Sequence, residues 1–228
     1  MRTPPRRRAR DGTAAVGSRV TRERLLEAAL RIFGELGFEG ASTRALADAA
    51  GANLAAIAYH FGSKEGLYRA VAKFIVERSS ETILPTIDRI AQSIASKKLS
   101  RSDAIELLHQ LLEQFSAIVI GSRYTDSFAE FMMREQLHPG AAFGILYDGM
   151  TRPMTEACAS LLALASSRRA DRTTTLIRAQ TLLGQILVFR TSRASVLRQL
   201  GWHEFSKEQL KVVQSIVAEN VEWILAGK

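Results

Sequence analysis

Apolar residues recur at intervals of three and four along most of the chain, and apolar–polar alternation with a period of two is scarce. Runs such as LLEAALRIF and TLLGQILVF show the longer spacing. A period near 3.6 places apolar side chains on one face of an α-helix, whereas a period of two would indicate a strand. The pattern therefore predicts an all-α protein of about nine to ten helices.

Glycine, proline and polar clusters interrupt this pattern and divide it into expected helices. Thr21 is expected to cap a first helix that Gly37 ends, with Leu25, Ala29, Ile32, Phe33 and Leu36 facing inward. Pro85 should separate a helix over residues 64–80 from the next. Later helices are expected over residues 86–96, 103–121, 125–137, 140–165, 173–200 and from Ser206 onward, with a kink or division near Thr151 before Pro153.

The stretch from Ser42 to Lys64, STRALADAAGANLAAIAYHFGSK, predicts two short helices around a tight turn, followed by the start of a third. Ser42 or Thr43 can cap the first helix and Asn53 the second, because their side-chain oxygens accept a free amide proton. Gly51 stands where the first of these helices ends. The arrangement is typical of a helix-turn-helix, whose second helix enters the DNA major groove.

The strings TRALADAAG and IAYHFGSKEGLYRAV resemble the DNA-binding domain of the TetR family of bacterial transcriptional regulators, from about Thr21 to Val71. A second string, REQLHPGAAFGILYDGMTRP, resembles the CecR-like branch of that family. The resemblance implies a three-helix DNA-binding domain followed by a larger helical domain for ligand binding and dimerisation. Ala58 departs from the family, most of whose members have Tyr there.

The chemistry of the exposed positions and the resemblance together indicate the DNA-binding residues. Arg44 stands near a helix start, where a guanidinium suits phosphates or guanine edges. By resemblance Tyr59 faces DNA, and His60 and Lys64 reach phosphates; a locally hydrogen-bonded His60 is the alternative. The expected set is Thr43, Arg44, Asn53, Leu54, Ala55, Ala56, Ala58, Tyr59, His60 and Lys64.

Positive charge is concentrated at the N-terminal end. The 228-residue chain has a net charge of +8, and its first 80 residues contain 14 Lys and Arg against 8 Asp and Glu. This asymmetry indicates a polyanionic partner, and the helix-turn-helix favours duplex DNA over RNA or a membrane surface. We expect a disordered basic arm over residues 1–20, a DNA-binding domain with its connecting helix over 21–80, and a ligand-binding and dimerisation domain over 81–228. The arm either follows DNA phosphates or is a solvated tail.

Other classes of protein find little support. No apolar run approaches the ~20 residues that span a bilayer, and the basic N-terminus lacks the apolar core of a secretory signal. The lone Cys158 lies in an apolar helical segment, so buried filler is the main interpretation and a redox sensor the alternative. The four histidines have no metal-ligand spacing. We therefore expect no enzyme, metal or cofactor, and a bacterial cytoplasmic location.

The larger domain is expected to bind a small effector of unknown identity. Aromatic and Met side chains around a few polar groups suit a mainly apolar molecule, although the same residues could simply be core. The expected pocket residues are His109, Phe115, Phe128, Met132 and Tyr147.

The resemblance also implies a homodimer formed by the last long helices, around Gly140–Ala165 and Thr173–Arg193. The expected interface residues are Thr181, Gly184 and Val188. Together these inferences indicate a repressor that binds a palindromic DNA operator as a dimer until an effector releases it. A ligand-free or architectural DNA-binding regulator is the alternative.

Overall fold

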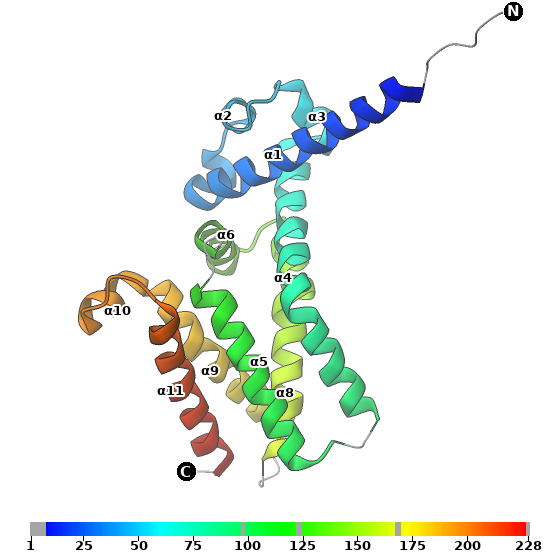
Figure 1. The fold of residues 1–228 in the computed structure, drawn as a ribbon. Helices are drawn as coiled ribbons and strands as arrows, with labels where there is room; N and C mark the ends of the chain where they lie inside the picture. The colour runs from blue at the N-terminus through cyan, green and yellow to red at the C-terminus, as the bar shows by residue number, and fades with distance from the viewer. Residues whose placement is uncertain (1–7, 97–98, 122–124, 167–169, 227–228) are drawn as a thin grey trace, which may run out of the picture. The chain divides into compact units, whose positions relative to one another are not determined.

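The computed structural model describes residues 8–96, 99–121, 125–166 and 170–226, and these ranges contain helices and no strand (Figure 1). The prediction of an all-α fold is therefore confirmed. The helices are α1 (Arg8–Gly40), α2 (Thr43–Ala49), α3 (Ala55–Phe61), α4 (Lys64–Ala95), α5 (Arg101–Gly121), α6 (Thr125–Leu137), α7 (Phe143–Leu146), the π-helix η1 (Tyr147–Thr151), α8 (Arg152–Ala165), α9 (Arg172–Thr191), α10 (Arg193–Leu200) and α11 (Lys207–Ala226).

The chain forms two units, and no single point along the sequence separates them. The first unit contains the chain up to Ile75 together with Glu130–Ile145. The second contains Val76–Ala129 and everything from Leu146 onward. Both α4 and α6 are thus shared, since each has residues in both units. The domain boundary that we expected after residue 80 does not anticipate the return of Glu130–Ile145 to the first unit.

The first unit is built around α1, whose buried side is rotated from the expected one. Leu25, Ala29 and Phe33 are fully buried as predicted, but Leu36 is 54% exposed and Leu26 is buried instead. The helix also begins at Arg8 rather than Thr21. The Thr21 hydroxyl donates to the Gly17 carbonyl and caps nothing, because helical backbone already precedes it. Residues 1–7 of the expected arm lie outside the described residues.

Gly37 ends the helical path of α1 as predicted. Its φ of 73° lies in the left-handed region that glycine adopts without strain. The chain then turns so that the ring of Phe38 stacks on Phe33 with 6.2 Å between centroids. This contact anchors the segment that leads from α1 into α2.

The second unit is centred on α8, which packs against α5 and α9. Buried residues occur on most sides of α8, so this helix is enclosed by its own chain. Cys158 is fully buried there, and burial raises the pKa of its thiol to about 12. A thiol with this pKa stays protonated near neutrality, which supports the filler interpretation over the redox sensor.

Two expected breaks differ in the structure. Pro85 lies inside a continuous α4, because packing on both sides of it, through Ile83 and Ile90, holds the helix together. Proline has no amide proton, so the carbonyl one turn earlier in α4 lacks its helical hydrogen bond. Because the proline ring is exposed, water can bond this carbonyl instead. In contrast, the single helix expected over 173–200 is divided at Ser192, whose backbone leaves the helical region.

The chain is not divided near Thr151, where we expected a kink or a division, but its helix type changes there. Residues Tyr147–Thr151 form the π-helix η1, and the backbone stays helical through Thr151 and Arg152 into α8, which has Pro153 in its first turn. Gly149 lets η1 approach α4 closely, since a Cβ there would lie 2.7 Å from a methyl group of Val76. None of the helices in the described ranges has the length and apolarity needed to cross a membrane.

Candidate nucleic-acid interface

Side-chain hydrogen bonds fix the starts of the two short helices. The Ser42 hydroxyl oxygen accepts a hydrogen bond from the Ala45 amide at 3.1 Å and caps α2. Gly51, with a φ of 57°, makes the turn. The Asn53 side-chain oxygen accepts from the amide of Ala55, the first residue of α3, at 3.0 Å, while the N-cap residue is Leu54, which makes no side-chain cap. Local chemistry therefore sets the angle at which α3 leaves the turn.

The predicted DNA-binding residues are all accessible on the outer side of this motif. Leu46 and Ile57 face the core and are buried. On the opposite side Tyr59 is 79% exposed and Leu54 is 50% exposed. Of the other members of the set, Arg44, Asn53, Ala55 and Ala58 are exposed, and Thr43, Ala56, His60 and Lys64 are half-buried.

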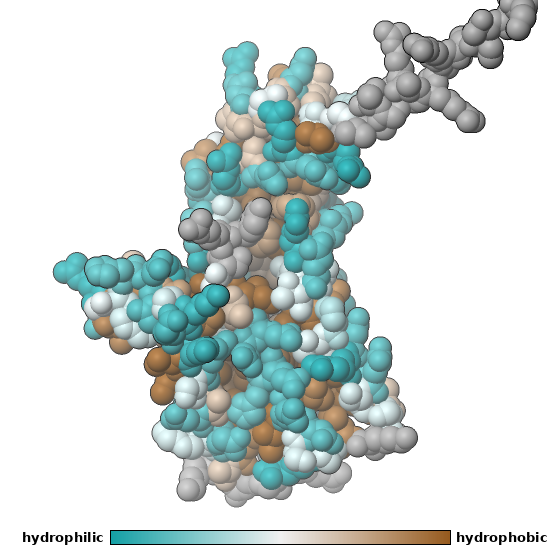
Figure 2. Space-filling model, viewed as in Figure 1, coloured by the Kyte–Doolittle hydropathy of each residue, from teal (hydrophilic) through white to brown (hydrophobic). Residues whose placement is uncertain are grey.

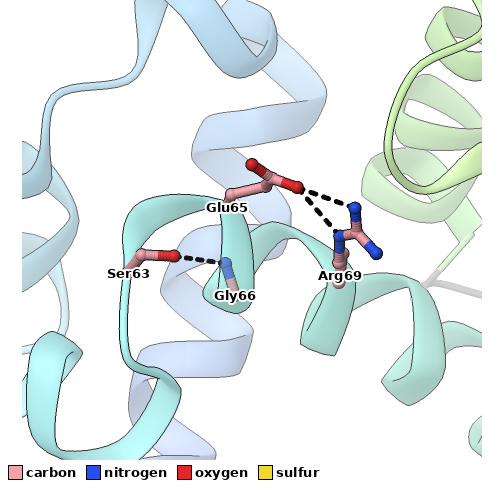
Figure 3. A network of polar contacts seen from close by, with 4 residues as sticks. All are labelled: Ser63, Glu65, Gly66 and Arg69. Carbon is pink, nitrogen blue, oxygen red and sulfur yellow. Dashed lines mark hydrogen bonds and ion pairs between the residues drawn. The ribbon is translucent and has the colours of Figure 1, made fainter.

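The junction between α3 and α4 is held by a short polar network (Figure 3). Gly62 turns the chain with a φ of 77°, and the Ser63 hydroxyl oxygen accepts from the Gly66 amide at 3.0 Å, which caps α4. Arg69 donates two hydrogen bonds to a single oxygen of Glu65, at 2.8 and 3.0 Å. The Glu65 carboxylate is therefore paired with Arg69, one turn further along α4. The Lys64 ammonium is then the dominant charge at the start of this helix.

Two cations of the first unit lie over aromatic rings. The Lys64 ammonium is 4.3 Å from the centre of the Phe38 ring, and the Arg22 guanidinium is 5.5 Å from that of Phe61. A ring face attracts a cation and restricts where it sits. The sequence indicated Lys64 as a charge near DNA, but gave no signal that aromatic rings position Lys64 and Arg22.

The comparisons with known proteins agree with this geometry. The family model "Bacterial regulatory proteins, tetR family" matches residues 25–71, which contain the capped motif. The model "HTH-type transcriptional dual regulator CecR, C-terminal domain" matches residues 104–228. The HTH-type transcriptional dual regulator CecR of Shigella flexneri is 31% identical over 206 residues, which cover 90% of this chain and 92% of that protein.

The chain belongs to the TetR family, in its CecR-like branch. Solved TetR-like structures share the fold. A TetR-like transcriptional regulator from Rhodococcus sp. RHA1 superposes with a TM-score of 0.64 at 22% identity, over 91% of this chain and 97% of that one. AibR in complex with isovaleryl coenzyme A and operator DNA gives a TM-score of 0.58 at 17% identity, over 90% and 97%. The protein is thus a TetR-family transcriptional regulator.

The residues expected to bind a ligand in this TetR-family chain belong to both units. Met132 belongs to the first unit, while the other four belong to the second. Phe115 packs against the core of the second unit. His109 on α5 lies 3.1 Å from Glu222 on α11 and lines a cavity of ≈ 90 Å³. The five residues are thus divided between two units, and a ligand site that they share stays a prediction.

A larger cavity of ≈ 220 Å³ lies elsewhere in the second unit, where α8, α9 and α11 meet. Its lining is mostly apolar, with Ser166, the half-buried Arg178 and the buried Thr175 as polar residues. None of the residues expected to bind the ligand lines it. Across the described ranges, no group of three or more His, Cys, Asp or Glu side chains is arranged to hold a metal ion.

Proposed function

We propose that this TetR-family protein is a repressor that binds a palindromic operator as a dimer and is released by a small, mainly apolar effector. The observation that carries the proposal is the outer side of α2 and α3. It combines an exposed Arg44 and Tyr59 with a run of small side chains, on the more basic part of the chain. A surface of this kind fits a major groove, where few side chains hydrogen-bond and the backbone can come close.

Base recognition is then divided among a few side chains. Ala55, Ala56 and Ala58 offer no hydrogen bonds, so bonds to base edges fall to Arg44, Asn53 and Tyr59. Because the Asn53 oxygen already accepts from the Ala55 amide, its amide nitrogen is the part that can donate to a base. The alanine methyl groups suit contact with thymine methyl groups. With Ala58 in place of the usual Tyr, α3 presents a flatter surface at this position.

Substitutions of Arg44 and Lys64 should separate base reading from phosphate binding. We expect Arg44→Ala to weaken operator binding by ~1–3 kcal/mol and to relax the preference at one base pair. Lys64→Ala should weaken binding to all sequences alike and reduce the slope of log K against log salt by about 0.9, the value for one phosphate contact. Fluorescence anisotropy on operator and scrambled duplexes over a salt series measures both. Equal, sequence-independent losses from the two variants would contradict this division.

The dimer contact is best placed on α9 and α11. The enclosed position of α8 leaves little of it for a partner chain, which argues against the region around Gly140–Ala165. The expected residues Thr181, Gly184 and Val188 are all exposed on α9. With Ile177 they form a stripe along that helix, and α11 has a similar exposed stripe. We call these two stripes together the α9–α11 face: Ile177, Thr181, Gly184, Val188, Val212, Ile216 and Trp223.

The two stripes adjoin each other. The Asn220 amide on α11 donates to the Gln185 oxygen on α9 at 2.7 Å. Val188 stands three residues after Gln185, and Trp223 stands three residues after Asn220, so each is a neighbour on its own helix. The two helices run in opposite directions (Figure 1), and the Asn220–Gln185 bond joins them next to both stripes. Figure 2 shows apolar surface beside α11 below α10, and apolar area of this kind is typical of an interface between copies.

Effector release requires a route from the second unit to the first. α4 provides one, because it is continuous from Lys64 to Ala95 and belongs to both units. A ligand that changes the second unit can therefore change the direction of α4, and with it the spacing of the two α3 helices in a dimer. The half-sites of the operator fix the spacing that binds.

Linkage gives a direct test of this route. A coupling of ~1–3 kcal/mol would weaken operator binding by about 5–150-fold when the effector is bound. Operator DNA must then weaken effector binding by the same factor. A panel of small apolar acids and acyl thioesters, screened by thermal shift, would supply a ligand for calorimetry with and without operator. Ligand affinity that does not change with operator would refute effector release, even for a ligand that binds tightly.

The cavity sizes give the second candidate, a regulator without a ligand, some support. Pockets for drug-sized ligands measure about 300–1,000 Å³, whereas the two cavities described above measure ≈ 220 and ≈ 90 Å³. If no member of the panel raises the melting temperature while operator binding is intact, this second function is favoured. A ligand that does bind must be small or must open the core of the second unit.

A further inference from the structure

The end of α6 is part of the core of the DNA-binding unit. Glu130–Ile145 groups with the chain up to Ile75. Phe131 is fully buried, and its ring centre lies 4.7 Å from that of Tyr68 on α4. α6 therefore begins in the second unit, at Thr125–Ala129, and ends among the residues that support the helix-turn-helix.

Arg134 fixes this segment to the end of α1. Its Nε donates to the Gly34 carbonyl at 2.5 Å, and a terminal guanidinium nitrogen donates to the Glu35 carbonyl. These carbonyls belong to the last turn before Gly37, where no further helical amide can reach them. A cation at this end of a helix is also favoured by the helix dipole. Arg134 thus acts as a cap for α1 supplied by a distant part of the chain.

Glu135 fixes the same segment to α4. Its side chain is almost completely buried, at 3% exposure. One carboxylate oxygen accepts a hydrogen bond from the Tyr68 hydroxyl at 2.7 Å, and the other accepts from the Gly140 amide at 3.0 Å. Burial, followed by the bond to Glu135, raises the pKa of Tyr68, so the hydroxyl remains a donor. Both oxygens of a buried acid are therefore satisfied, which gives Tyr68 a defined position.

A chain of ring contacts connects Tyr68 to Lys64. The Tyr68 ring packs edge-to-face on Phe38, with centroids 5.1 Å apart, and on Phe33, with centroids 4.8 Å apart. The Lys64 ammonium lies 4.3 Å from the centre of that same Phe38 ring. Lys64 and Tyr68 are also one turn apart on α4. The location of the ammonium therefore depends on Phe38, which depends on Tyr68, which is held by Glu135.

We propose that Glu135 is a positioning residue for operator binding: through Tyr68 and Phe38 it sets where the Lys64 ammonium meets the DNA backbone. This inference rests on the proposed function, in which Lys64 contacts a phosphate. It gives a role in DNA binding to the REQLHPG segment, although this segment is far from the helix-turn-helix along the sequence. Because Glu135 is on α6, any movement of that helix by an effector also acts on Lys64.

A double-mutant cycle tests the proposal. Glu135→Ala should leave the Lys64 ammonium without a fixed position. We expect it to weaken operator binding about 10-fold and to reduce the slope of log K against log salt by about 0.9. In a Lys64→Ala background the same change should have little further effect. Glu135→Gln should restore part of both quantities, because its amide oxygen can still accept from Tyr68 although the Gly140 amide loses its acceptor. Leu26→Ala, a buried change elsewhere in the unit, should leave the salt slope as it is.

All variants are compared at a temperature where circular dichroism shows them folded. If Glu135→Ala does not fold, Tyr68→Phe replaces it, because this variant keeps the ring and removes only the hydroxyl. In a Lys64→Ala background, Tyr68→Phe should cause little further loss of operator affinity or salt slope. Losses that add, or an unchanged salt slope, would overturn the positioning role and leave the phosphate contact of Lys64 intact. A Lys64→Ala variant with unchanged affinity and slope would instead overturn the assignment of Lys64 itself, and the positioning role with it.

Discussion

A Val188→Asp variant is expected to be a monomer and to lose operator binding by about 100- to 10,000-fold, the range by which linking two binding modules raises avidity. Val188 lies on the α9–α11 face, and a charge at the centre of an apolar interface must be desolvated without a partner. The chain itself should remain folded, since an exposed substitution changes its stability by about 0.5 kcal/mol or less. Light scattering should give the 25.1 kDa chain mass for this variant and twice that value for the parent.

Leu164→Asp is the matched control for Val188→Asp. Both side chains are apolar and 42% exposed, but Leu164 is on α8. The control should remain a dimer and bind operator normally, and Ile216→Asp, on the α11 side of the face, should behave like Val188→Asp. Dissociation by Leu164→Asp, with a normal dimer for Val188→Asp, would return the interface to the helix around Gly140–Ala165 and refute the assignment made here.

The features that the sequence predicted well are those decided by near neighbours. Ser42, Asn53 and Ser63 each accept a hydrogen bond from an amide two or three residues further on. Residue type and spacing are sufficient to predict such bonds. The irregular helix before Pro153 was located for the same reason, because a proline determines its own φ and acts on the turn that precedes it. The TetR-family motif is made of such local features, which is why its outer residues could be named from the sequence.

Features decided by distant parts of the chain were missed or misplaced. Pro85 predicted a break, but Thr86 is buried and its hydroxyl bonds Gln114 on α5 at 2.7 Å, so packing against α5 holds α4 together. Glu135 and Tyr68 are 67 residues apart in sequence, and neither has a local pattern that indicates the other. The expected pocket stays a prediction for the same reason, since periodicity predicts that a helix has a buried side but not which helices cover it.

Gly66→Ala should damage the DNA-binding unit more than any exposed change to its residues. Gly66 is in the first turn of α4, and a Cβ there would lie only 1.9 Å from the Phe61 carbonyl oxygen at the end of α3. The obstacle is backbone, so no side-chain rotation can relieve it, and α3 and α4 must separate. The Ser63 cap, whose acceptor is aimed at the Gly66 amide (Figure 3), would be lost in the same movement.

We expect Gly66→Ala to lower the free energy of unfolding by about 3 kcal/mol or more, the upper part of the range for overpacking, and to abolish operator binding because α3 is displaced. Gly144→Ala makes the same change in the same unit where no atom lies within 4 Å of the new Cβ, and it should be close to neutral. Urea denaturation followed by circular dichroism, with anisotropy for operator binding, measures both effects. Equal stability of the two variants would mean that α4 can move away from Phe61 freely, and then the α3–α4 junction could not hold the recognition helix in one orientation against DNA.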